Sequence, residues 1–257
     1  GAALRAIVPT MLGAGVPDYF FEHQLGQFIE NTRTTRRLNQ IRAGLSDERL
    51  VIVSLARDPF QWARSSVIQD IVGYIPILEK LHHPGTGAEN TSDAIVEQGL
   101  RRVLRDLAAL MEREGGVDPC LRKSALGELS FRDTVFESTP DSMRFFYLFS
   151  RPVNWFWQHF ETALDIRIRD MDRVGRAFEY HDENLDVVIL RYEAFDDDLA
   201  HFLERVGLPA PEQITAQNVS REKPHAGAVN AAFDGEDGAR IAALLRDTVY
   251  ARTFGYS

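Results

Sequence analysis

Continuous apolar runs mark two buried strands in this sequence. Residues 49–56 read RLVIVSLA and residues 186–191 read DVVILR. Strands that are apolar on both faces are typical of parallel sheets covered by helices on both sides. The short aromatic segment at residues 18–23, DYFFEH, predicts a third buried strand.

Helical periodicity fills much of the chain between these strands. We predict helices over residues 3–12, 24–44, 60–74, 93–114, 141–164, 196–206 and 237–249. The clearest apolar stripe lies in 93–114, where Ser92 can cap the helix and Gly115 and Gly116 can end it. Pro152 is expected to interrupt the helix over 141–164.

The alternation of strands and helices predicts an α/β fold. The expected architecture has three layers, α/β/α, around a mainly parallel sheet. No composition change marks a linker, so we predict one domain over residues 1–257 with a helical insertion at about 84–164. Within it, residues 84–92 are expected to form a loop, and the tail from 209 to 235 is expected to be irregular.

Composition and charge narrow the range of functions. The net charge of −9 argues against a general nucleic-acid binder, which needs a broad basic face, but leaves room for one small basic pocket. No apolar run reaches the roughly 18 residues of a membrane helix. Cys120 is the single cysteine and cannot form an internal disulfide, so we expect a reducing, cytoplasmic setting.

The best-defined candidate site is the segment RDPFQWARSS at residues 57–66. Arg57 lies just beyond the carboxyl end of a buried strand, where ligands bind in open α/β sheets. Pro59 suits the first turn of the next helix, whose N–H groups favour an anion. Arg57 could bind a phosphate through its planar fork, and Ser65 could add a hydroxyl. Alternatively, Arg57 caps a carbonyl or pairs with Asp58, and Ser65 is a surface hydroxyl.

This strand, R-D-P and serine pattern resembles the 3′-phosphate-binding element of sulfotransferases. The resemblance implies a P-loop NTPase-like fold and a sulfuryl donor, 3′-phosphoadenosine 5′-phosphosulfate, held by Arg57 and Ser65. The segment at 186–209, DVVILRYEAFDDDLAHFLERVGLP, resembles the late strand and helix of the same family. It implies that Tyr192 lies near the adenine of the donor.

Two other segments are similar to sulfotransferase-like proteins of bacterial capsular polysaccharide synthesis. One is Asn218–Phe233, where Arg221 and Lys223 could reach a phosphate or could belong to an exposed loop. The other is the strand at 18–23, after which that group carries a histidine. Sulfuryl transfer needs a base for the acceptor hydroxyl, and His23, then Glu22, are the candidates. The resemblance implies a hydroxyl acceptor, such as a surface glycan, and no metal.

The sequence departs from the family at its start. A sulfotransferase carries a loop such as K-x-G-[ST]-[ST] that binds the 5′-phosphosulfate, and this chain has none. We expect a natural N-terminal piece to precede Gly1; the alternative is a protein that has lost the loop. Two other functions therefore stay open: a non-catalytic nucleotide-binding relative, and a capsule-pathway transferase that uses a nucleotide sugar.

Overall fold

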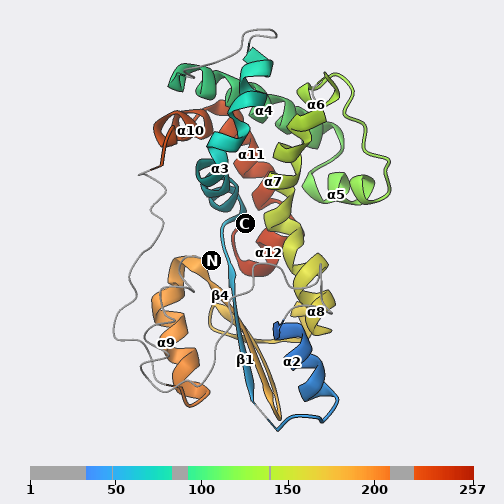
Figure 1. The fold of residues 1–257 in the computed structure, drawn as a ribbon, viewed down its shortest axis with the longest axis vertical. Helices are drawn as coiled ribbons and strands as arrows, with labels where there is room; N and C mark the ends of the chain where they lie inside the picture. Colours follow the sequence, from blue (N-terminus) through green and yellow to red (C-terminus); the bar gives the residue numbers. More distant parts are fainter. Residues whose placement is uncertain (1–32, 48, 83–91, 139, 209–222) are drawn as a thin grey trace. The chain divides into compact units, whose positions relative to one another are not determined.

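The computed structural model describes residues 33–47, 49–82, 92–138, 140–208 and 223–257, and the chain divides into two compact units (Figure 1). The sheet unit comprises residues 1–57 and 155–218, and the helical unit comprises residues 58–154 and 219–257. Every described strand belongs to the sheet unit. Most of the expected helical insertion, up to residue 154, belongs to the helical unit.

The sheet has four strands and is mixed. In spatial order the strands are β1 (Leu50–Ala56), β4 (Leu185–Arg191), β3 (Ala177–Asp182) and β2 (Asp172–Val174). The pair β1–β4 is parallel, whereas β4–β3 and β3–β2 are antiparallel. The predicted α/β character is confirmed, but the expectation of a mainly parallel sheet is wrong. Only residues 175–176 and 183–184 join the last three strands, and parallel pairing needs a crossover of about a dozen residues or more.

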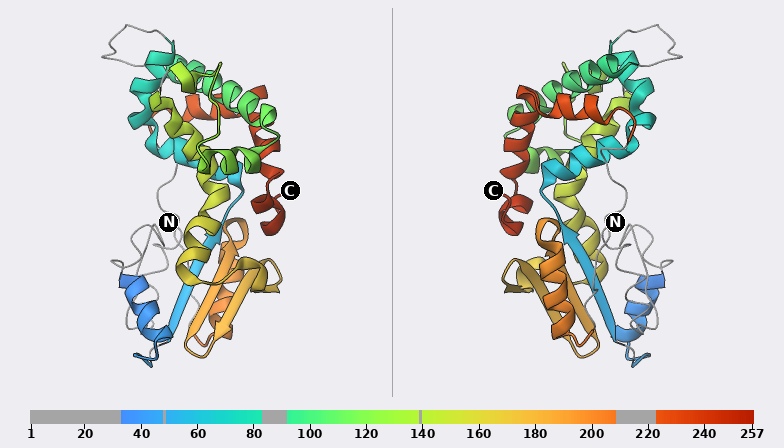
Figure 2. Two further views of the ribbon diagram at one scale, coloured as in Figure 1. Left: turned by 90° about the vertical axis from the view of Figure 1, so that its right-hand side faces the viewer. Right: turned by 90° about the vertical axis from the view of Figure 1, so that its left-hand side faces the viewer.

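Both faces of β4 are covered, as its apolar run predicts. Its side chains alternate between the faces. On one face, α9 (Phe195–Arg205) completes a buried apolar cluster of Ala177, Val188, Leu190, Phe195, Leu199, Phe202, Leu203 and Val206. Figures 1 and 2 show α9 along this face and α2 (Arg33–Arg42) and α8 (Thr162–Leu164) toward the opposite side of the sheet.

The sequence of α9 explains where it begins and ends. Asp196, Asp197 and Asp198 lie in the first turn, where carboxylates interact favourably with the positive end of the helix dipole. Gly207 follows with φ +74°, the left-handed conformation that ends many helices. The helix predicted over 196–206 is therefore confirmed to within one residue at each end.

The helical unit is built around α4, against which α3, α10 and α11 pack. Its helices are α3 (Pro59–His82), α4 (Asp93–Arg113), α5 (Val117–Ala125), α6 (Val135–Ser138), α7 (Met143–Trp155), α10 (Ala226–Phe233), α11 (Glu236–Arg246) and α12 (Val249–Phe254). The stripe predicted for α4 is buried except for Ile95. A Cβ added at Gly99 would lie 3.0 Å from the Cβ of Leu78, so this glycine lets α3 approach α4 closely.

Several helix boundaries differ from the prediction. The helix predicted over 60–74 continues to His82 with Pro76 inside it, and buried Ile77, Leu78 and Leu81 compensate for the lost hydrogen bond. Ser92 stands at the predicted N-cap of α4, but its side chain makes no cap hydrogen bond.

The interruption expected at Pro152 lies elsewhere. α7 runs through this proline, and the irregular part is a π-helical segment at Phe156–Glu161. The prediction of an irregular tail to residue 235 is wrong for α10, whose small residues pack against α3 and α4. The helix expected over 3–12, the strand over 18–23 and residues 24–32 of the next helix lie outside the described residues.

Candidate nucleotide site at the strand ends

The carboxyl ends of β1 and β4 bring two of the expected site residues together. In the parallel register Ala56 is the partner of Arg191, so Arg57 and Tyr192 follow at the same level of the sheet. The guanidinium carbon of Arg57 lies 4.5 Å from the centroid of the Tyr192 ring. This distance is typical of a cation–π contact, which aligns the planar guanidinium with the ring.

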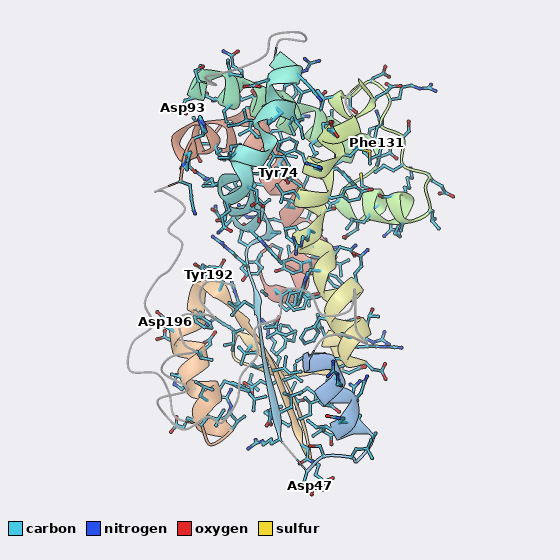
Figure 3. The ribbon with its side chains drawn as sticks, viewed as in Figure 1. Asp47, Tyr74, Asp93, Phe131, Tyr192 and Asp196 are labelled. Carbon is cyan, nitrogen blue, oxygen red and sulfur yellow. The ribbon has the colours of Figure 1, made fainter. Side chains whose placement is uncertain are left out.

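Charged side chains gather at this edge of the sheet. Arg57 and Arg191 carry two positive charges at neighbouring positions, and both are partly exposed, while Glu193 beside them is exposed. Tyr192 is 42% exposed, so a planar ligand can reach it. Figure 3 shows Tyr192 just before α9 and Asp196 on the outer side of that helix. The first-turn carboxylates of α9 exclude its N-terminus as the anion site, and Asp198 already binds Arg176 at 3.2 Å.

The start of α3, in the helical unit, is occupied by the protein's own carboxylate. The backbone N–H of Gln61 donates to Oδ1 of Asp58 at 2.9 Å, and Arg246 Nε donates to Oδ2 of Asp58 at 3.0 Å. Asp58 therefore acts as the N-cap that satisfies this helix end. The expectation that free N–H groups here favour a ligand anion is wrong for the N–H of Gln61.

The other expected site residues belong to the helical unit or lie outside the described residues. Ser65 is half-buried on α3 and belongs to the helical unit, whereas Arg57 belongs to the sheet unit. Lys223 is half-buried just before α10, where its carbonyl accepts a hydrogen bond from Ala226 N at 3.3 Å. His23, Glu22 and Arg221 lie outside the described residues.

One histidine–carboxylate pair in the helical unit was not anticipated. His225 precedes α10 in the left-handed conformation, with φ +57°, and its Nδ1 lies 2.6 Å from Oδ1 of Asp93. A carboxylate on Nδ1 orients the ring and leaves Nε2 as the catalytic nitrogen in many enzymes. The K-P-H-A sequence contains no periodic signal for this pair, because Asp93 lies more than a hundred residues away in the chain.

A denser polar cluster lies at the opposite end of the sheet. Glu179 and Asp186 are buried on β3 and β4, and His181 lies between them. The segment AFEYHD alternates aromatic and polar residues after Gly175, which is the signal of a hairpin strand that could have revealed them. None of these three residues was among the expected site residues.

Other chemistry is restricted in the described part of the chain. Burial raises the pKa of the Cys120 thiol to about 11, so this thiol stays protonated and is a poor nucleophile at neutral pH. No cluster of three or more histidine, cysteine, aspartate or glutamate side chains in the described ranges could bind a metal ion. None of the helices described here combines the length and the apolar character needed to span a membrane.

Comparison with family models, with curated proteins and with solved structures finds no match to this chain.

Proposed function

We propose that this chain is a sulfotransferase-like enzyme that transfers a sulfuryl group from 3′-phosphoadenosine 5′-phosphosulfate to a hydroxyl, such as that of a bacterial surface or capsular glycan. The observation that carries the proposal is the contact between the Arg57 guanidinium and the Tyr192 ring at the carboxyl ends of β1 and β4. A cation and an aromatic face at one sheet edge match a ligand that is both anionic and planar.

The donor fits these two residues by its chemistry. A guanidinium binds a phosphate through two parallel hydrogen bonds, and a half-exposed aromatic ring can stack on an adenine. In this proposal Arg57 binds the 3′-phosphate and Tyr192 lies beside the base. Ser65, Arg221 and Lys223 are the further donor-binding residues that the resemblance implies. A three-layer, P-loop NTPase-like single domain in the cytoplasm belongs to the same proposal.

The reaction would be a single in-line transfer. The acceptor hydroxyl oxygen forms a bond to sulfur while the bond from sulfur to the phosphate oxygen breaks. The products are the sulfated acceptor and 3′-phosphoadenosine 5′-phosphate, and the hydroxyl proton passes to a base. His23, or Glu22, is the base in this proposal, and fixed positive charge stabilises the transferred group.

A second candidate is a transferase that uses a nucleotide sugar, because Arg57 and Tyr192 would also suit a uridine or guanosine diphosphate. The third is a non-catalytic relative that only binds the adenosine bisphosphate. All three bind a nucleotide at the same residues, so the identity of the nucleotide distinguishes the second from the others.

Calorimetric titration tests the site directly. We expect 3′-phosphoadenosine 5′-phosphate to bind and Arg57→Ala to weaken this binding by about 30-fold, the effect of one lost charged hydrogen-bonding group. The matched control is Arg173→Ala, because Arg173 also lies over an aromatic ring, that of Phe178 at 6.0 Å, but on the edge strand β2.

The outcomes separate the candidates. Equal affinities for the unmodified chain and Arg57→Ala would remove the site. Binding of nucleoside diphosphate sugars without binding of the adenosine bisphosphate would replace the sulfotransferase by the sugar transferase. Binding of the bisphosphate, without sulfate transfer from the donor by the chain extended upstream of Gly1, would favour the non-catalytic relative.

A further inference from the structure

The amino ends of β1 and β4 carry a buried carboxylate with two cationic partners. Asp186, with its side chain 3% exposed, accepts a hydrogen bond from Arg49 Nε to Oδ2 at 2.5 Å. Its other oxygen, Oδ1, lies 2.8 Å from Nδ1 of His181 on β3, the directly opposite residue of the antiparallel register. Both carboxylate oxygens are therefore engaged by cationic or ring nitrogens.

A second buried carboxylate lies two residues along β3 on the same face. Glu179 is 1% exposed and accepts hydrogen bonds from Nε and Nη2 of Arg205. Oε2 of Glu179 also lies 3.2 Å from Nε2 of His181. His181 thus lies between two buried carboxylates that come from two different strands.

The two contacts of the His181 ring are both favourable in only one protonation state of the imidazole. A neutral imidazole has one N–H donor and one lone pair, whereas an imidazolium has two N–H donors. Both ring nitrogens of His181 face carboxylate oxygens, which only accept hydrogen bonds. In the neutral form, one nitrogen lone pair would point at a buried carboxylate oxygen. Only the imidazolium satisfies both contacts.

The charges that face His181 come from every element around it. Asp186 and Glu179 contact it from β4 and β3. Arg49 binds the other oxygen of Asp186, and Arg205 binds both oxygens of Glu179, including the one that His181 contacts. The hydrogen bond to Asp186 is the largest cause that raises the pKa of His181, ahead of the opposing effect of burial and of the hydrogen bond to Glu179.

The same residues hold the carboxyl end of α9 on the sheet. Arg205 is in the last turn of α9, and Arg49 also donates to the carbonyl oxygen of Val206 at 3.0 Å. Cations at this end interact favourably with the negative end of the helix dipole. Beyond these polar contacts, α9 is held by the apolar cluster on the inner face of the sheet.

We propose that His181 is a pH-sensitive clamp: its imidazolium joins Asp186 and Glu179 and, with Arg49 and Arg205, fastens the last turn of α9 to the sheet, and loss of the proton at higher pH loosens that turn. The device is independent of the nucleotide site, since it involves none of the residues assigned to the donor.

Two measurements on the full chain test the clamp. In the first, side-chain nitrogen and proton shifts of the histidines are followed by NMR as pH is raised. We expect His181 to titrate above the ordinary histidine pKa of 6.5, because both of its ring nitrogens face carboxylate oxygens. Glu179→Gln should move the His181 midpoint down, because it removes one of the two charges.

In the second measurement, hydrogen exchange of α9 is compared at about pH 6 and about pH 8.5, after correction for the intrinsic pH dependence of exchange. We expect the last turn to lose protection at the higher pH in the unmodified chain. His181→Gln should remove this loss, and His201→Gln, the matched control, should retain it.

The clamp is overturned if the His181 midpoint lies at or below the ordinary histidine pKa of 6.5, or if His181→Gln loses protection with pH as the unmodified chain does. Should His181→Gln fail to fold, the NMR titration of the unmodified chain still decides the question, since it needs no variant.

Discussion

The two ends of the parallel pair β1–β4 carry opposite kinds of polar group. At the carboxyl ends, Arg57 and Arg191 carry positive charge beside the half-exposed ring of Tyr192. At the amino ends, the carboxylates of Asp186 and Glu179 are almost completely buried and are surrounded by three cationic side chains. The same two strands therefore present an accessible cationic edge and a closed network of ion pairs.

This difference in burial between the two strand ends separates a candidate binding site from residues that support the fold. A buried carboxylate is costly unless nearby cations and hydrogen bonds compensate for the lost hydration, so Asp186 and Glu179 are paired within the fold. Tyr192 is 42% exposed and carries no charge, so it has no such requirement, and it can exchange water for a ligand. On this argument the carboxyl end is where binding should be tested, and the amino end is where stability should be tested.

The largest expected effect comes from removing one cation of the closed network. Arg205→Met leaves the buried Glu179 with His181 as its partner, and we expect a loss of about 3 kcal/mol in the free energy of unfolding. Urea unfolding measures it. Arg176→Met is the control, because its bridge to Asp198 involves a half-exposed arginine, and we expect less than about 1 kcal/mol. Equal losses in the two variants would contradict the description of a buried network.

At the carboxyl ends of β1 and β4, a substitution should lower ligand affinity and leave the free energy of unfolding almost unchanged. Tyr192→Ala removes the ring but no buried charge, so we expect the unfolding free energy to change by less than about 0.5 kcal/mol while the affinity for 3′-phosphoadenosine 5′-phosphate falls about tenfold. Calorimetry and urea unfolding on the same samples give both numbers. Phe178→Ala serves as the control for a ring under an arginine, since Phe178 belongs to β3 and should leave the affinity unchanged.

The sequence predicted the open end of the sheet better than the closed end, for a physical reason. Continuous apolar runs predict β1 and β4. Arg57 and Tyr192 directly follow these runs, so the local sequence was sufficient to place both residues at strand ends. The network depends on the pairing of β1 with β4, which brings Arg49 to Asp186 over 137 residues of chain, and on α9, which carries Arg205. No local pattern encodes such a contact.

The wrong sequence predictions also concern elements that no strong local pattern marks. The antiparallel β2 and β3 were missed because the polar Glu179, His181 and Asp182 interrupt the kind of apolar run that marks β1 and β4. The short turns at 175–176 and 183–184 make the pairing of these strands antiparallel. α10 and α12 were missed because small residues and short length weaken their periodicity.

The smallest expected effect is the pH dependence of global stability. The pKa of His181 is raised in the folded chain, so its contribution is fully present below the ordinary histidine pKa of 6.5 and is lost as pH rises through the higher folded value. Because the side chain is half-exposed, solvent screening keeps the effect small. Urea unfolding of the unmodified chain and His181→Gln across this range should give curves that differ most at acidic pH and converge at alkaline pH. A difference that grows with pH would mean that neutral His181, and not its imidazolium, stabilises the network.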